Sequence, residues 1–348
     1  MVSDEEKLLV NVLYREESES LQGIDIINVN FENLMKLASN HLMLPALFFN
    51  INKKNLSHLF PVDFIECIKK VYLINKARNE VLLKEAKELS ELLYKNNINH
   101  IFLKGTALLL SNVFEDIGER MMCDIDFIIQ HKDEEKIKKV LQKNKYASKD
   151  SNHSFRIFKP THLPRMVNKN KTIGIEPHLE LLEPKYRWFF NSKKLINDFK
   201  DVTKTIKTPA KSFLFDHCIY AIHIRDQGII KSYHSHRSIY DIYKLDCKHS
   251  LTINNIKKNI FIKHFFITIN KFKIFDIQIV PDLSSYYFEK LFRFSDPLLS
   301  LVFKIITKWL MIIQLITNND FRKYALNKLI NLYQSKTLLN YIYRWLKA

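Results

Sequence analysis

Glycine, proline and cysteine are all scarce in this chain. Only 5 glycines and 9 prolines occur among 348 residues, which leaves little room for long flexible linkers or low-complexity segments. The 4 cysteines form no CxxC pair, so the sequence indicates neither a zinc site nor a disulfide framework. Their positions are Cys67, Cys123, Cys218 and Cys247.

The first residues lack a basic region followed by an apolar core, so no signal peptide is expected. Together with the free thiols, this predicts a cytoplasmic protein. One apolar stretch, Leu298 to Thr317, is long enough to cross a bilayer. Lys304 and Lys308 lie one turn apart within it and give it a polar stripe. We therefore expect a buried amphipathic helix and no membrane span, with docking on a membrane surface as the alternative.

The composition is that of a globular protein, with 47% hydrophobic residues and a length that fits one large or two medium domains. The formal net charge of +17 has two explanations. It is compatible with an anionic partner such as a nucleotide, RNA or a membrane surface. Codon bias explains it better, because lysine, isoleucine and asparagine are frequent throughout and no run of like charge forms a tail.

Helical periodicity dominates the first hundred residues. Ser3 and Glu6 have the spacing of a capping box before the first apolar run. A second helix is predicted over Phe31–Phe49, ending near Asn50, and a long third helix over Asp63–Asn96.

The pattern then changes to short strands and helices. Strands are predicted over His100–Leu103, Cys123–Gln130 and Ile173–Leu182, and helices over Ala107–Phe114 and Asp133–Asn144. Helical periodicity returns from Ser212, most clearly at Phe213–Ile224 and Ser238–Leu245. The sequence therefore predicts an α+β protein, in which a small mixed β-sheet core (98–210) lies between N-terminal (1–97) and C-terminal (211–348) helical regions.

Two carboxylates mark the second predicted strand. Side chains alternate along a strand, so Asp124 and Asp126 project from the same face. They repel each other unless a cation neutralises them, and Mg²⁺ (or Mn²⁺) suits such a pair. A DxD pair is also compatible with a solvated strand end, or with a glycosyltransferase that binds a metal-bound sugar nucleotide.

A strand-to-helix turn, Lys104-Gly105-Thr106, precedes this pair. The amides of Thr106 and Ala107 are expected to open the helix, where partial positive charge favours phosphate. The Thr106 hydroxyl and the Lys104 ammonium would add a hydrogen bond and a point charge. The alternative is an ordinary turn without a ligand.

A third carboxylate would complete a two-metal site. Glu176, on the later strand, is the first candidate and is expected to share a face with His178 and Glu180. Glu180 and Glu183 are the reserves, and a surface role for Glu176 is the alternative. Pro177 cannot donate to a central strand ladder, so it predicts an edge strand or a bulge and leaves the direction of Glu176 open.

The runs FLKGTALLL, GERMMCDIDFII and GIEPHLEL resemble a poorly characterised bacterial nucleotidyltransferase family within the DNA polymerase β-like superfamily. Two further segments resemble that family, so the likeness covers most of the chain. They are the helix at Leu34–Leu47 and the segment Phe213–Asp241, which includes His217, His223 and Arg237.

The resemblance implies roles for individual residues. Gly105 and Thr106 would bind the triphosphate, and the metal would be held by Asp124, Asp126 and Glu176. Arg120 matches the family's arginine before the acid pair, where it would touch phosphate, pair with the acids or form a structural salt bridge. His178 would donate a hydrogen bond behind the metal ligands or be a core histidine.

Other histidines are weaker candidates. His217 and His223 do not share a helical face and are not expected to bind metal. His234 and His236 are candidates for substrate contact.

The predicted activity is a Mg²⁺-dependent transfer of a nucleoside monophosphate from an NTP to an acceptor hydroxyl, with release of pyrophosphate. The acceptor is a small molecule, a peptide or protein side chain, or an RNA end. A nucleotide-binding regulatory module without turnover is the main alternative. A DxD glycosyltransferase is a weaker one, because it does not explain the Lys104-Gly105-Thr106 turn.

Overall fold

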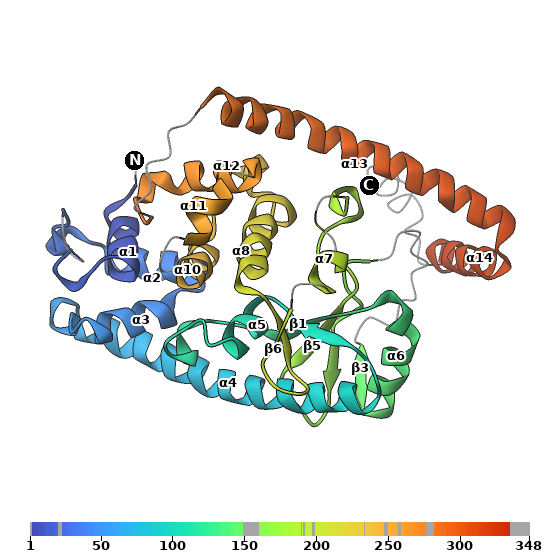
Figure 1. Ribbon diagram of the computed structural model, residues 1–348, viewed down its shortest axis with the longest axis horizontal. Coiled ribbons are helices and arrows are strands. Elements are labelled where there is room, and N and C mark those ends of the chain that lie inside the picture. Colours follow the sequence, from blue (N-terminus) through green and yellow to red (C-terminus); the bar gives the residue numbers. More distant parts are fainter. Residues whose placement is uncertain are drawn as a thin grey trace.

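The computed structural model contains a mixed β-sheet together with N-terminal and C-terminal groups of helices, as Figure 1 shows. This confirms the predicted α+β class. The division into regions 1–97, 98–210 and 211–348 stays a prediction. The structure describes residues 2–19, 23–148, 160–188, 190, 192–196, 199–232, 234–246, 250–256, 259–275 and 282–334.

Four helices precede the sheet: α1 (Asp4–Tyr14), α2 (Phe31–Asn40), α3 (Leu44–Lys53) and α4 (Val62–Lys95). The predicted long third helix is confirmed by α4. Ser3 caps α1, and its Oγ accepts a hydrogen bond from the Glu6 amide at 3.2 Å. The Glu6 carboxylate contacts His236 Nε2 at 3.0 Å, so this side chain links α1 to a distant helix.

The prediction of one helix over Phe31–Phe49 is wrong, because the chain breaks between α2 and α3. Leu42 has a left-handed φ of 56°, and the Met43 amide turns back to the Ala38 carbonyl at 2.7 Å. Pro45 lies in the first turn of α3, where its missing N–H costs no helical hydrogen bond. Inside one continuous helix, the same proline would have removed such a bond.

The main sheet has five strands in the order β1-β2-β5-β4-β3. The central pair, β2 and β5, is parallel and the other pairs are antiparallel. The strands are β1 (His100–Phe102), β2 (Asp124–Ile129), β3 (Tyr146–Ser148), β4 (Met166–Asn168) and β5 (Gly174–His178). Helix α5 (Lys104–Leu110) follows β1, and α6 (Glu134–Lys143) follows β2.

Two of the predicted strands are confirmed by β1 and β2. The third is shorter than predicted, because β5 ends at His178 and not at Leu182. Glu180 is therefore not on a shared strand face with Glu176. The Glu180 carboxylate instead contacts His131 Nε2 at 2.8 Å, and His131 follows the C-terminal end of β2.

Pro177 lies in a central strand, so the predicted edge strand is wrong. The Pro177 carbonyl accepts a hydrogen bond from the Leu163 amide at 2.8 Å, on the side away from β2. The N–H and C=O groups of one strand residue point to the same side. The missing N–H therefore faces the Leu163 segment and removes no bond from the β2–β5 ladder.

Smaller elements and further helices follow the sheet. They are α7 (Ser192–Ile196), β6 (Phe199–Asp201), β7 (Lys207–Pro209), α8 (Lys211–Tyr220), a π-helical segment (Ala221–Arg225), α9 (Gly228–Lys231), α10 (His236–Leu245), α11 (Ser250–Ile256), α12 (Ile260–Ile269), α13 (Leu283–Thr317) and α14 (Asn319–Gln334). The helices predicted near Phe213 and Ser238 are confirmed by α8 and α10.

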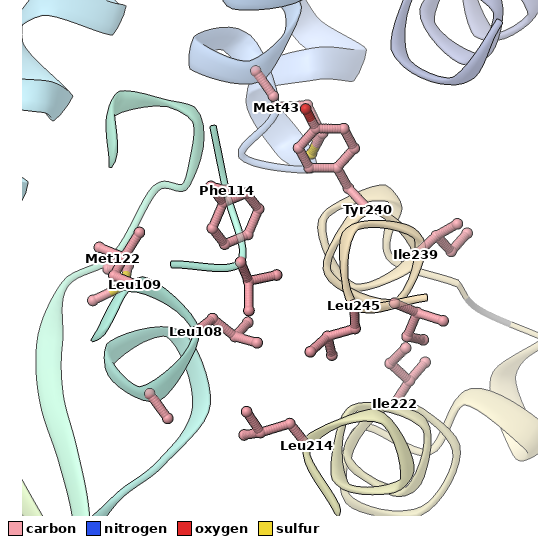
Figure 2. Close-up of a cluster of buried hydrophobic side chains, with 14 of the residues drawn as sticks. Met43, Leu108, Leu109, Phe114, Met122, Leu214, Ile222, Ile239, Tyr240 and Leu245 are labelled. Carbon is pink, nitrogen blue, oxygen red and sulfur yellow. The ribbon is translucent and has the colours of Figure 1, made fainter. Parts of the chain in front are cut away.

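Helix α5 packs against the C-terminal helices. Figure 2 shows Leu108 of α5 facing Leu214 of α8 and Leu245 of α10. All three side chains are buried in one cluster. This packing sets the positions of α8 and α10 relative to the Lys104-Gly105-Thr106 turn, because that turn is the beginning of α5.

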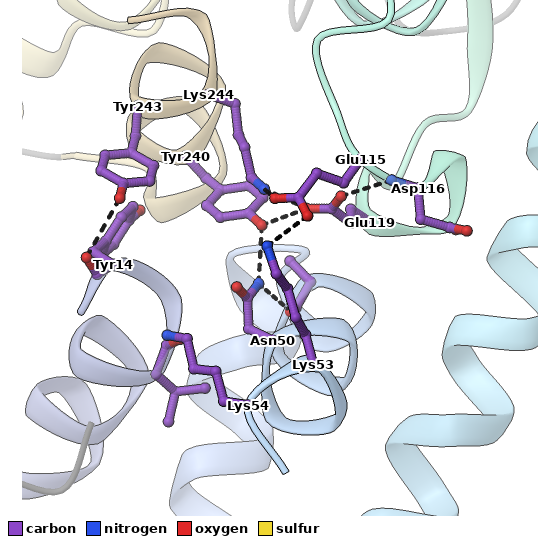
Figure 3. A network of polar contacts seen from close by, with 12 residues as sticks. Tyr14, Asn50, Lys53, Lys54, Glu115, Asp116, Glu119, Tyr240, Tyr243 and Lys244 are labelled. Atoms are coloured by element: carbon purple, nitrogen blue, oxygen red, sulfur yellow. Dashed lines mark hydrogen bonds and ion pairs between the residues drawn. The ribbon is translucent and has the colours of Figure 1, made fainter. Parts of the chain in front are cut away.

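A buried polar network joins α3, the segment before β2, and α10 (Figure 3). The Tyr240 hydroxyl donates to Glu119 Oε2 at 2.5 Å and accepts from Asn50 Nδ2 at 2.9 Å. Lys244 Nζ lies 3.1 Å from the same Glu119 oxygen. Glu119 immediately precedes Arg120, so the network also positions the segment that leads into β2.

The expectation that Leu298–Thr317 is buried is wrong. This stretch forms the second half of α13, the long helix along one edge of the molecule in Figure 1. None of its most apolar 18-residue window is buried, and Trp309 is 63% exposed. By length and composition alone, this is the one helix among the described residues that could cross a membrane. The polar stripe predicted a buried face, but the described residues of this stretch are at most partly buried.

Candidate active site

The register between β2 and β5 brings the predicted acids together. Asp126 lies opposite Glu176, and Asp124 lies opposite Gly174. Asp126, Glu176 and His178 each offer one possible ligand atom, and these three atoms lie within 4.8 Å of one another. Two elements far apart in sequence thus supply one cluster. Asp124 lies outside this group of three.

Asp126 is the most heavily contacted of these acids. Lys104 Nζ donates to its Oδ1 at 2.6 Å, and His178 Nε2 lies 2.8 Å from the same atom. Burial raises the pKa of Asp126, but the hydrogen bond with His178 and the charge of Lys104 outweigh burial and hold that pKa below its usual value. Burial also lowers the pKa of His178. Asp126 is therefore held as a carboxylate.

Asp124 is in the opposite electrostatic situation. Burial, with the negative charges of Asp126 and Glu176, raises its pKa to about 6. Lys104 and Arg165 offset only part of this effect. The positive charge near Asp124 is therefore too small to offset its burial and the neighbouring acids.

The turn before α5 differs from its predicted geometry. The helix begins at Lys104, so the Ala107 amide already donates to the Leu103 carbonyl at 3.1 Å. Ala107 thus has no amide to offer a phosphate. Thr106 is fully buried, and its hydroxyl donates to the Asp124 carbonyl at 3.5 Å, toward β2. The helix also ends at Leu110 and not at Phe114.

Lys104 and Gly105 explain the shape of this turn. Lys104 has a left-handed φ of 50°, an uncommon conformation for a residue with a side chain, which is often found at functional sites. A Cβ on Gly105 would lie 2.6 Å from Met122 Sδ. The glycine therefore lets α5 approach the segment before β2 closely.

Arg120 forms a salt bridge with a residue of the C-terminal helices. Its Nε and Nη2 donate to the two carboxylate oxygens of Asp241 at 2.7 and 2.9 Å. Both side chains are buried. Of the three roles considered for Arg120, the structural salt bridge is present, and the pairing with Asp124 or Asp126 is not.

One cavity of about 530 Å³ gathers these groups. Its size is that of a small-molecule site. The residues around it come from the sheet, from α5 and from the C-terminal helices. They are Lys104, Gly105, Thr106, Arg120, Met122, Cys123, Asp124, Asp126, Thr161, His162, Glu176, His178, Leu181, Leu182, Glu183, Arg225 and Arg237.

A comparison with family models matches residues 28–253 to a family described as uncharacterised nucleotidyltransferases. The match covers well over half of the chain. The protein belongs to this nucleotidyltransferase family. A comparison with curated proteins finds no match.

A divalent cation fits the donor set of this cavity. Carboxylate oxygens of Asp126 and Glu176 and an imidazole nitrogen of His178 converge within 4.8 Å. Mg²⁺ and Mn²⁺ prefer oxygen ligands such as the carboxylates of Asp126 and Glu176. The repulsion that raises the pKa of Asp124 is what a nearby cation would relieve.

The site differs in membership from the one predicted from sequence. His178 belongs to the cluster of possible ligands, whereas sequence reasoning treated it as a supporting or core histidine. Arg225 and Arg237 line the cavity and were not predicted to bind a ligand. Arg237 lies in one of the segments that resemble the family, but nothing in that segment showed that it lines the same cavity as the acids.

The remaining candidates lie elsewhere or have other partners. Glu183 lines the cavity, whereas Glu180 does not. His217 is buried, and burial lowers its pKa to about 3. His236 is fully buried against Glu6, and neither His234 nor His236 lines the cavity, so the structure does not support their predicted substrate contact.

Proposed function

We propose that this nucleotidyltransferase moves a nucleoside monophosphate from an NTP to a hydroxyl of an acceptor, in a reaction that depends on Mg²⁺ or Mn²⁺. The observation that supports it is the register of Asp126 with Glu176, which collects acids in a cavity that Lys104 also lines. Membership of a nucleotidyltransferase family gives the reaction class.

Asp126, Glu176 and His178 would hold the metal, with Asp124 at the margin of the group. When bound, the metal would neutralise phosphate charge and activate the attacking hydroxyl. Lys104 is placed to exchange its contact with Asp126 for one with a phosphate oxygen. Arg120 keeps its pairing with Asp241 and supports the cavity wall.

The chemical step balances as a substitution at the α-phosphorus. A bond forms between the acceptor oxygen and the α-phosphorus, and the bond from that phosphorus to the β-phosphate oxygen breaks. Pyrophosphate leaves, and a carboxylate of the acid group takes the hydroxyl proton. The acceptor is a small molecule, a peptide or protein side chain, or an RNA end.

One observation favours a second function, nucleotide binding without turnover. The Lys104 ammonium lies 2.6 Å from Asp126, in a position that competes with a metal ion. If a bound nucleotide does not draw Lys104 away, the site binds NTP without reacting.

Pyrophosphate release from each of the four NTPs, with and without Mg²⁺ and with cell extract as the source of acceptors, tests the proposal. Asp126→Asn is expected to lower the rate at least about 100-fold, because it removes a charged ligand at the reacting centre. Asp201→Asn, a change on the exposed strand β6, is the matched control and is expected to keep the rate. NTP binding without any pyrophosphate release would support the silent module.

A further inference from the structure

The cavity has a basic wall as well as an acidic one. Arg225 comes from the end of the π-helical segment and Arg237 from the first turn of α10, whereas Asp126 and Glu176 come from the sheet. Acidic and basic groups thus enter one space from different parts of the fold. Such an arrangement suits a ligand that carries both a metal-bound end and a further negative charge.

The basic side chains that line the cavity differ in whether they form an ion pair with a carboxylate. Lys104 is paired with Asp126, and Arg120 with Asp241. Arg225 donates to its neighbour Asp226 at 2.9 Å, in a pair that is more than a third exposed. Arg237 forms no ion pair with any residue that the structure describes, and its buried Nε has no hydrogen-bond partner.

The surroundings of Arg237 also oppose its charge. Burial lowers the pKa of its guanidinium, and the positive charges of Arg120 and Arg225 add to this effect, which the negative charges of Asp241 and Asp226 offset only in part. An arginine nevertheless stays protonated in a protein. A largely buried guanidinium whose Nε has no hydrogen-bond partner is unfavourable, so this wall of the cavity is suited to an anion.

We propose that Arg237, with Arg225 beside it, binds the phosphates of the NTP that leave as pyrophosphate. This rests on the proposed function, in which the α-phosphate reacts at the acids. The β- and γ-phosphates then extend toward the helical wall. The planar guanidinium offers two parallel N–H groups to phosphate oxygens, which an ammonium cannot.

Binding of inorganic tripolyphosphate, measured by calorimetry in EDTA, tests this without catalysis. Arg237→Gln is expected to weaken binding about 10- to 100-fold, and Arg237→Lys by less, because lysine keeps the charge but loses the fork. Lys231→Gln makes the same charge change at an exposed position of α9 and is expected to have no effect. Thermal melting of each variant checks that it is folded.

The outcomes separate the two proposals. Unchanged tripolyphosphate affinity in a folded Arg237→Gln variant overturns this inference, even if the wild-type chain releases pyrophosphate. Arg237-dependent binding by a wild-type chain that never releases pyrophosphate supports the inference and refutes the transfer reaction. A loss of AMP affinity equal to the loss for tripolyphosphate also overturns it, because AMP lacks the leaving phosphates.

The exposed half of α13 independently points to a second site. Trp309 is 63% exposed and Ile316 69% exposed, and they belong to an apolar stretch of which none is buried. Monomeric proteins rarely expose an apolar surface of this extent without a partner for it. The first half of α13 also exposes apolar side chains, such as Leu291 and Phe294, but it is anchored to the fold because Asp296 is buried and paired with Lys185 at 2.6 Å.

Charge indicates what would cover this surface. From Pro297 to Thr317 the only charged residues are Lys304 and Lys308, and no acid is present. A second copy packed symmetrically on this helix would bring the same lysines toward each other. Placing both lysines inside a bilayer is costly, whereas lysines beside an apolar face suit the surface of an anionic membrane.

We propose that the second half of α13 lies on anionic lipid headgroups. Co-sedimentation with vesicles that contain phosphatidylglycerol is expected to remove the wild-type chain from solution, and pure phosphatidylcholine vesicles are expected not to. Trp309→Asp is expected to weaken binding at least about 10-fold, because it places a charge in the apolar face. The control is Ile27→Asp, at an isoleucine that is 88% exposed elsewhere.

Three results would overturn this second proposal. One is a chain that stays in solution with both kinds of vesicle. Another is a chain that an alkaline wash cannot release from membranes, because it would then span the bilayer. The third is a Trp309→Asp variant that turns a dimer into a monomer and leaves vesicle binding unchanged.

Discussion

Arg120 and Asp241 form a buried ion pair between the segment before β2 and helix α10. Removing one charge of such a pair leaves the other uncompensated in a poorly solvated place. The pair therefore connects the stability of the fold to the shape of the cavity, because Arg120 also lines it.

Asp241→Asn is expected to lower the free energy of unfolding by about 3–5 kcal/mol, since it strands the Arg120 charge. Urea denaturation measures this. Asp226→Asn removes the carboxylate of the exposed pair with Arg225 and is expected to cost less than about 1 kcal/mol. Equal losses from the two changes would show that Arg120 does not depend on Asp241.

At the scale of elements, the close approach of α4 to the turn Ile117–Glu119 depends on one glycine. The Gly118 carbonyl accepts from Asn75 Nδ2 at 2.7 Å. A Cβ on Gly118 would lie 2.6 Å from Cε2 of the Tyr72 ring and 2.9 Å from Asp116 Oδ1. A rigid ring and a capping carboxylate leave little room for adjustment.

Gly118→Ala is expected to destabilise the protein by about 1–3 kcal/mol, because α4 and the turn must separate. Gly105→Ala is the comparison, and it is expected to cost less. The atom closest to that Cβ is the flexible end of Met122. Thermal unfolding of both variants measures the difference, and a larger loss at Gly105 would contradict this account.

At the scale of the whole molecule, one hydrophobic cluster includes residues from all three predicted regions, from Leu8 through Phe127 to Phe275. The polar network of Figure 3 crosses the same boundaries, from Asn50 of α3 to Tyr240 of α10. The helices on both sides of the sheet therefore hold the helical wall of the cavity in place.

Tyr240→Phe is expected to reduce the free energy of unfolding by about 1–3 kcal/mol, because it leaves buried groups of Asn50 and Glu119 without their hydroxyl partner. Tyr243→Phe removes a longer, partly buried contact of 3.5 Å to the Tyr14 carbonyl and is expected to cost less. Chemical denaturation compares the two variants. Similar losses would show that the network adds nothing beyond packing.

Local patterns determined much of this protein. Alternation along a strand placed Asp124 and Asp126 on one face, and apolar periodicity predicted α4, because both depend only on the geometry of a single element. The acidic motifs are short runs of residues, so the family resemblance that rests on them could also be seen in the sequence.

Only the tertiary structure decided which distant elements meet. The β2–β5 register set Glu176 beside Asp126 despite Pro177, and the packing of α8 and α10 brought Arg225 and Arg237 to the same cavity. It also left the most apolar stretch of α13 without a buried residue. A sequence pattern shows that a side chain favours an apolar or a charged neighbour. Which residue becomes that neighbour depends on how distant elements pack together.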